Sequence, residues 1–169
     1  MMSVVYYFAG VPASGKTTIV RALIERFLPA PEEIRWGKLR GIKQNNVEVL
    51  GVYDGNKFDG TDRLAMDVIN DTIQYIQKNR KLSPPRVFIV EGDRLLNKRF
   101  LDAVAAKIIV IDATADILHQ RHQQRRDTQD TTFLKRCRKK VENIIEQYGL
   151  KRYWNNTRED SDRLVSYLI

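Results

Sequence analysis

The sequence is poor in the features that stabilise secreted proteins or hold a chain in a membrane. Its 169 residues include one cysteine, Cys137, so the chain cannot form an internal disulfide, as is usual in a reducing compartment. No apolar run approaches the length that spans a bilayer, and residues 1–10 lack the charged region and cleavage pattern of a secretion signal. We therefore expect a cytoplasmic protein that does not bind membranes.

Internal repeats, low-complexity tracts and a linker between domains are also missing. At 169 residues the chain is long enough to bury a substantial core without a disulfide or a structural metal. We predict a single domain over residues 1–169, and we expect it to be a monomer or a weak dimer.

Positive charge exceeds negative charge, and the excess is unevenly distributed. The chain has 29 Lys and Arg against 21 Asp and Glu, which gives a net charge of +8. Residues 119–140 hold eight of the basic residues and two of the acidic ones. Such a local field attracts polyphosphates or a nucleic-acid strand, although a solvated helix face would have the same composition.

One segment carries a specific ligand-binding pattern. Residues 10–17 read Gly-Val-Pro-Ala-Ser-Gly-Lys-Thr, which fits the phosphate-binding loop G-x-x-x-x-G-K-[ST] and lies between an apolar run and an amphipathic segment. The glycines let backbone N–H groups face phosphate oxygens, Lys16 reaches the β- and γ-phosphates, and Thr17 offers its hydroxyl to Mg²⁺. The predicted nucleoside triphosphate-binding residues are Gly10, Pro12, Ala13, Ser14, Gly15, Lys16, Thr17 and Thr18.

Apolar spacing predicts alternating strands and helices. The expected strands are residues 3–9, 39–44, 47–53, 87–90, 107–111 and 153–155, and the expected helices are 16–28, 64–76, 131–148 and 164–168. The runs at 87–90 and 107–111 are apolar throughout, as in parallel strands covered on both faces. The pattern favours an α/β fold of the P-loop NTPase kind, three layers (α/β/α) around a central parallel sheet of five strands.

Acidic residues follow the predicted strand at 87–90. Glu91 and Asp93 come at its carboxyl end, where side chains of such a sheet face the metal and phosphate site. Either carboxylate can hold a water on Mg²⁺ or accept a proton from an attacking hydroxyl. The sequence leaves this division of labour open, and we place Glu91 with Thr17 at the metal.

A second polar cluster, residues 53–63, connects an extended segment to a helix. In a functional interpretation, Asp62 is the general base for an acceptor hydroxyl and Arg63 holds the acceptor's phosphate. In a structural interpretation, the cluster is a helix start capped by Thr61 or Asp62.

Three arginines follow the last apolar strand. Arg121, Arg125 and Arg126 lie four and five residues apart, so on a helix they share one side. Small P-loop kinases have a mobile lid at this place, here residues 119–140 with a tip at 127–131. Its arginines would stabilise the transferred phosphoryl group and exclude water, and a solvated helix face is the alternative.

Taken together, residues 10–17, Glu91-Gly-Asp-Arg94 and the arginine-bearing lid resemble the small P-loop kinases of the nucleotide and polynucleotide kinase superfamily. The segments Val49-Leu-Gly-Val-Tyr-Asp54, Gly60-Thr-Asp-Arg-Leu64 and Glu91-Gly-Asp-Arg-Leu95 are more narrowly similar to those of bacteriophage kinases that phosphorylate 5-hydroxymethyluracil in DNA. The resemblance implies ATP and Mg²⁺ as cofactors and the host cytoplasm as location. It implies catalytic roles for Lys16, Asp62, Arg63, Glu91, Asp93, Arg121 and Arg125, the last two also contacting ATP.

Two further patterns bear on the ligands. Asn155-Asn156-Thr157, at the end of the last expected strand, is a candidate to contact the nucleotide base, with Asn156 as the binding residue, although a polar turn fits equally well. The basic residues near Trp36 suit a DNA strand whose target base is turned out and stacked on an aromatic ring. These basic residues are Arg35, Lys38, Arg40 and Lys43, and the stacking candidates are Trp36, Tyr53 and Phe58.

Three functions follow from these patterns. We favour ATP-dependent phosphorylation of a nucleotide hydroxyl, that of 5-hydroxymethyluracil in DNA. A nucleoside or deoxynucleoside monophosphate kinase is the first alternative, and an ATP-hydrolysing DNA-binding module without an acceptor is the second.

Overall fold

A mixed sheet of seven strands forms the centre of the computed structural model, which describes residues 2–55, 58–125 and 129–168. The strands are β1 (Val4–Ala9), β2 (Glu32–Trp36), β3 (Leu39–Gln44), β4 (Val47–Leu50), β5 (Val87–Glu91), β6 (Lys107–Asp112) and β7 (Arg152–Trp154). Their order across the sheet is β2-β3-β4-β5-β1-β6-β7. The five strands from β4 to β7 in this order are parallel, as predicted, and β2 and β3 extend one edge in antiparallel pairs.

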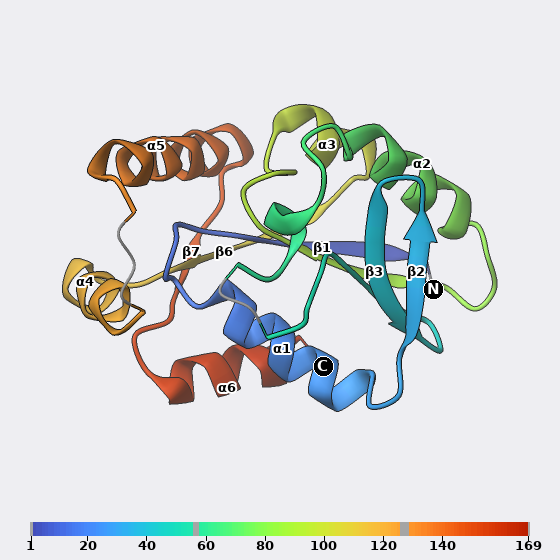
Figure 1. Ribbon diagram of the computed structural model, residues 1–169, viewed down its shortest axis with the longest axis horizontal. Helices are drawn as coiled ribbons and strands as arrows, with labels where there is room; N and C mark the ends of the chain where they lie inside the picture. The colour runs from blue at the N-terminus through green and yellow to red at the C-terminus, as the bar shows by residue number, and fades with distance from the viewer. Residues whose placement is uncertain (1, 56–57, 126–128, 169) are drawn as a thin grey trace.

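Helices cover both faces of this sheet (Figure 1). On one face lie α1 (Lys16–Phe27) and α6 (Arg158–Tyr167), and on the other lie α2 (Ile69–Asn79), α3 (Lys98–Ala103) and α5 (Thr131–Tyr148). Beyond the carboxyl ends of the strands lies α4 (Ala115–Gln124), and a short 3₁₀ helix, η1, spans Thr61–Arg63. The predicted three-layer α/β fold is therefore confirmed. Among the helices of the described ranges, none combines the length and apolar character needed to cross a bilayer.

Side chains of the central strands alternate between two apolar clusters. In β1, Tyr7 packs on the side of α2, α3 and α5, whereas the next residue, Phe8, packs on the side of α1 and α6. Phe88 and Ile89 of β5 divide in the same way. Successive residues of a strand point to opposite faces, so a strand covered on both sides is apolar throughout. Both clusters hold the strands in register, and the carboxyl ends of β1, β5 and β6 lie at one edge.

The helix predicted over residues 64–76 begins later than expected. Leu64 is extended and α2 starts at Ile69, although Leu64 and Val68 are both buried. Thr61 explains the delay in part, because its hydroxyl donates to the backbone oxygen of Glu91 at 2.6 Å. Residues 61–63 are thereby held against the end of β5, and the apolar spacing predicted burial correctly but not the helical conformation.

Candidate active site

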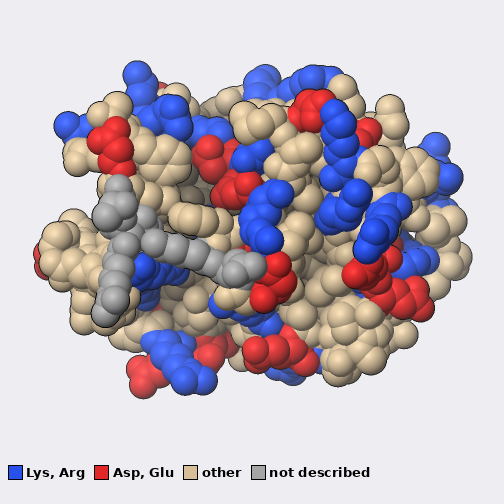
Figure 2. All heavy atoms as spheres, in the orientation of Figure 1, with Lys and Arg blue, Asp and Glu red and all other residues tan. Residues whose placement is uncertain are grey.

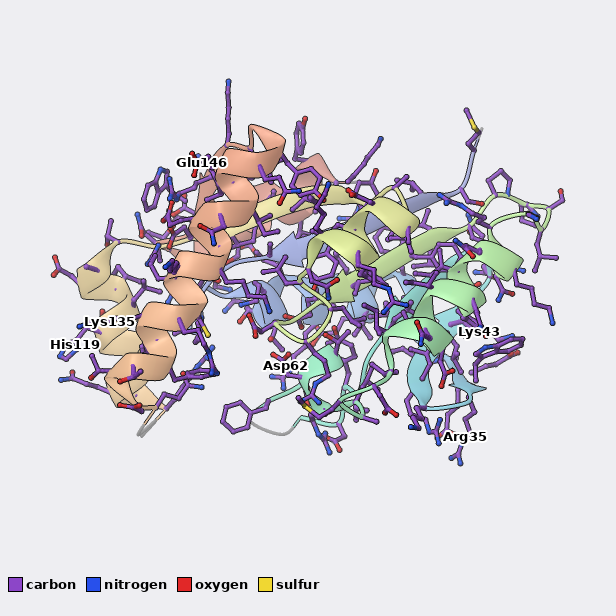
Figure 3. All side chains as sticks on the ribbon, turned by 90° about the horizontal axis from the view of Figure 1, so that it is seen from above. Arg35, Lys43, Asp62, His119, Lys135 and Glu146 are labelled. Atoms are coloured by element: carbon purple, nitrogen blue, oxygen red, sulfur yellow. The ribbon has the colours of Figure 1, made fainter. Side chains whose placement is uncertain are left out.

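A cleft of about 710 Å³ opens at the carboxyl ends of β1 and β5, bounded by η1 on one side and by α5 on the other. The predicted site residues that line it are Gly10, Pro12, Ala13, Gly15, Lys16, Thr17, Asp62, Arg63, Glu91, Asp93 and Arg125. Four others do not line it: Ser14, Thr18, Arg121 and Asn156. In Figure 3, Asp62 lies between α5, which carries Lys135, and the strands that carry Arg35 and Lys43.

The phosphate loop connects β1 to α1 with a conformation that its sequence makes possible. Gly15 precedes α1 in the left-handed region, with φ of 96°, and a Cβ there would lie 2.2 Å from Nδ2 of Asn155. Glycine is therefore required at this position both by the backbone angle and by the neighbouring amide. Ala13 also has a positive φ, 66°, where a side chain costs about 1 kcal/mol.

Lys16 is turned back onto the loop. Its ammonium group donates to the carbonyl oxygens of Gly10 and Val11, both at 3.0 Å. Burial lowers the pKa of Lys16, and the nearby Glu91 carboxylate opposes that shift. The loop thus holds an ammonium group at the lining of the cleft, next to the start of α1, which fits a polyphosphate ligand.

Glu91 is the most strongly perturbed acid of the site. It is 1 % exposed, accepts a hydrogen bond from the hydroxyl of Thr17 at 3.0 Å and accepts another from that of Tyr53 at 3.1 Å. Burial raises the pKa of Glu91 to about 7, against an ordinary value of 4.5. A hydroxyl and a carboxylate in contact are hard oxygen donors, so Thr17 and Glu91 fit Mg²⁺.

No group of three or more metal-ligating side chains occurs among the described residues. That count is compatible with Mg²⁺ in a phosphoryl-transfer site, because this ion uses one or two protein ligands and completes its shell with phosphate oxygens and water.

Asp62 braces the turn that follows β5. Its Oδ1 accepts hydrogen bonds from the backbone N–H groups of Asp93 and Arg94, both at 2.8 Å, and the Arg94 guanidinium donates to the Asp62 backbone oxygen at 2.8 Å. The structure therefore supplies a third use for Asp62, neither general base nor helix cap. The second carboxylate oxygen is not needed for this brace, so the role of base stays a prediction.

Arg63 lines the cleft, but carboxylates already surround it. Its guanidinium pairs with Asp54 and lies 3.7 Å from Asp59 Oδ1. Asp59 in turn has a fully buried side chain, paired with Arg21 at 2.6 Å. Holding an acceptor phosphate would require Arg63 to leave these partners, so the structure does not favour it for that role.

The wall formed by α5 was missed by sequence reasoning. Phe133, Arg136, Cys137 and Lys140 line the cleft from one side of this helix, at spacings of three and four residues. Lys140 pairs with Asp93, at 3.1 Å to Oδ2 and 2.7 Å to the backbone oxygen. The spacing of these residues on one helical face was the available signal. It was not recognised because basic residues at 135, 136 and 138–140 lie on several sides of the helix.

The two described lid arginines lie in different environments. Arg121 donates to the backbone oxygens of Ala13 at 3.1 Å and Asn155 at 2.8 Å, so it holds the phosphate loop from outside the cleft. Arg125 lines the cleft. Arg126 and the part of the predicted tip at 127–128 lie outside the described residues.

Asn155, the neighbour of the predicted Asn156, contacts the phosphate loop. Its Nδ2 donates to the backbone oxygen of Ser14 at 2.9 Å. The side chain of Asn156 instead accepts from the backbone N–H of Thr114 at 2.9 Å, away from the cleft lining. Two consecutive asparagines thus contact different segments, and a contact of Asn156 with a nucleotide base stays a prediction.

Of the three stacking candidates, only Phe58 lines the cleft, where it is 52 % exposed. Trp36 packs against Tyr75, with ring centroids 5.9 Å apart, and under the Lys78 ammonium. Tyr53 is occupied with Glu91.

The basic residues near Trp36 are largely occupied by local partners. Arg35 pairs with Glu33, Lys38 with Asp67, and Lys43 with Glu32. Figure 3 places Arg35 and Lys43 beyond Asp62, away from α5. Exposed basic side chains of α5 gather at the upper left of Figure 2, close to one wall of the cleft.

A family model described as P-loop Nucleotide Kinase3 matches residues 1–154. A comparison with curated proteins found no match. The matched range contains every residue that lines the cleft and ends one residue before Asn155.

Proposed function

The chain belongs to the P-loop Nucleotide Kinase3 family, and on that premise we propose that it transfers the γ-phosphoryl group of ATP to the hydroxymethyl group of 5-hydroxymethyluracil in DNA. A nucleotide kinase needs a donor site and an acceptor site that share one space. The observation that carries the proposal is the single cleft that joins the phosphate loop and Glu91 to an aromatic and basic wall on α5.

The donor side rests on the phosphate loop and the end of β5. Backbone amides of the loop and the first turn of α1 bind the phosphates, while Lys16 exchanges its two carbonyl partners for phosphate oxygens. Thr17 and Glu91 hold Mg²⁺, which neutralises charge on the β- and γ-phosphates when bound. Arg125 lines the same cleft and stabilises the transferred group.

The acceptor side lies between η1 and α5. Asp62 accepts the proton of the attacking hydroxyl through the oxygen that does not bind the 92–94 turn. Phe58 and Phe133 offer rings on which a base turned out of a strand can stack.

An acceptor phosphate is assigned to Arg136 rather than to Arg63. Within the part of the chain that the structure describes, Arg136 makes no ion pair; its guanidinium lies over the Phe133 ring, 5.2 Å from the centroid. It is exposed and lines the cleft, so it can bind a phosphate without losing a carboxylate partner. Lys135 and Lys139, exposed on the same helix, would lie along the path of a longer strand.

A nucleoside monophosphate kinase is the second candidate. It is favoured by one observation: Trp36 and the basic residues of β2 and β3 lie away from the cleft and have partners of their own. A polymer would therefore have to follow α5 alone, whereas a mononucleotide needs no track outside the cleft.

Labelled phosphate from ATP tests these alternatives directly. The protein is incubated with ATP, Mg²⁺ and DNA that contains or lacks 5-hydroxymethyluracil, and separately with free nucleoside monophosphates. The proposal predicts label only in the modified DNA, and none with Lys16→Ala. Label in the monophosphates would identify the second candidate, and phosphate release without any labelled acceptor would reject both kinases.

A further inference from the structure

We propose that Asn155 is a positioning residue that aims the phosphate loop, through Ser14, at a polyphosphate ligand. This inference rests on the proposed function, because it concerns the same ATP site. It starts from a buried amide: Asn155 is 2 % exposed, outside the cleft, and donates from Nδ2 to the backbone oxygen of Ser14 at 2.9 Å.

Because of the geometry of the peptide bond, the contact to the Ser14 oxygen also orients the N–H group of Gly15. The carbonyl of Ser14 and the N–H of Gly15 belong to one planar trans peptide, so they point in opposite directions. Asn155 holds the Ser14 oxygen on the outer side of the loop. The Gly15 N–H is thereby aimed at the inner side, where Gly15 lines the cleft.

The orientation of the Asn155 amide is itself determined. Oδ1 accepts a hydrogen bond from the hydroxyl of Ser161 at 2.6 Å, which leaves Nδ2 for Ser14. Ser161 lies in α6, whose first turn is capped by Thr157 and Asp160. The backbone N–H of Asn155 donates to the Asp112 oxygen at 2.8 Å and continues the pairing of β7 with β6. Both the main chain and the side chain of Asn155 are therefore fixed by elements outside the loop.

The glycine of the loop is matched to this amide. A Cβ at position 15 would lie 2.2 Å from Nδ2 of Asn155, so the Asn155 amide occupies the space that a side chain at position 15 would need. A contact to the nucleotide base would need no such match, because the amide points at the back of the loop and not into the cleft.

The test compares two ligands that share phosphates but differ in the base. Binding of ATP and of inorganic tripolyphosphate, each with Mg²⁺, is measured by calorimetry on the wild type and on Asn155→Ala. The loss of one buried hydrogen bond that orients the loop should weaken both ligands to the same extent, about tenfold. The matched control is Asn143→Ala, an exposed asparagine of α5, which should bind both ligands as the wild type does.

An unchanged tripolyphosphate affinity in Asn155→Ala would overturn the inference, and a weaker affinity for ATP alone would assign Asn155 to the base instead. If Asn155→Ala is unfolded at the assay temperature, Ser161→Ala decides the matter. Ser161→Ala keeps Nδ2 of Asn155 but removes the hydrogen bond that orients the amide. The affinities for ATP and for tripolyphosphate should both fall about threefold. Affinities equal to those of the wild type would defeat the inference. Wild-type protein that binds neither ligand would defeat the proposed function as well, whereas binding that the variants retain would defeat only the role of Asn155.

Discussion

Replacing Glu91 with glutamine should remove a pH-dependent loss of stability. In the folded protein burial raises the pKa of Glu91 to about 7, whereas the unfolded chain releases this proton near the ordinary value of 4.5. Between these two values the folded state binds more protons than the unfolded state, so the free energy of unfolding falls as pH rises. The stabilisation is complete below the unfolded pKa and is lost as pH rises through the folded one.

The difference between the two pKa values corresponds to about 3 kcal/mol in the free energy of unfolding. About 2.5 kcal/mol of this stabilisation is lost between about pH 5 and about pH 8. Glutamine keeps the shape of the protonated side chain and does not titrate. Urea unfolding of the wild type and of Glu91→Gln, both with a chelator and without nucleotide, measures the difference at each pH. All other groups titrate in both proteins, so the change in this difference isolates Glu91.

We expect Glu91→Gln to gain about 2.5 kcal/mol relative to the wild type across that pH range. The matched control is Glu146→Gln, an exposed glutamate of α5, for which the difference should stay constant. A constant difference for Glu91→Gln as well would refute the reasoning, since it would mean that this carboxyl group titrates alike in both states.

Three further predictions concern the acceptor, the base and the loop. Arg136→Ala should raise the KM for the acceptor about tenfold and leave the KM for ATP unchanged. The control Asn143→Ala, exposed on the same helix but outside the cleft lining, should alter neither KM, and equal effects of the two variants would remove Arg136 from the acceptor site. Asp62→Asn should lower kcat at least about a hundredfold and spare ATP binding, because asparagine still accepts the two turn amides but takes no proton; unchanged turnover would move the base to Asp93 or Glu91. Ala13→Gly should raise the free energy of unfolding by up to about 1 kcal/mol in urea titrations, since glycine tolerates a φ of 66°, and a loss of stability would contradict this.

Local patterns predicted the parts of the fold whose cause is local. The unit of β1, phosphate loop and α1 follows from glycine placement and apolar spacing, and Glu91 follows from its position at the end of an apolar strand. By contrast, α3 has six residues, too few for a helical repeat to be recognised, and β2 is an edge strand with charged residues at its start. Neither element carries the periodicity on which such predictions depend.

The contacts between site residues could not be predicted from the sequence, for a different reason. Asp93 meets Lys140, and Ser14 meets Asn155, across 47 and 141 positions of the chain. Such pairs depend on how α5 and β7 pack on the sheet, which no pattern within one segment encodes. The pairing of Arg63 with Asp54 is a further contact of this kind, made between side chains nine positions apart in a segment without regular periodicity.

The Lys16 ammonium group donates to carbonyl oxygens of its own loop, and these hydrogen bonds affect which anions the loop binds. A ligand must replace two charge-assisted hydrogen bonds, to Gly10 and Val11, before it gains anything from this lysine. Orthophosphate has a single phosphate group with which to replace these two hydrogen bonds. A chain of phosphates can bind the lysine and several backbone amides at the same time. The loop should therefore bind polyphosphates more tightly than orthophosphate, and inorganic phosphate in a cell should not keep ATP from binding.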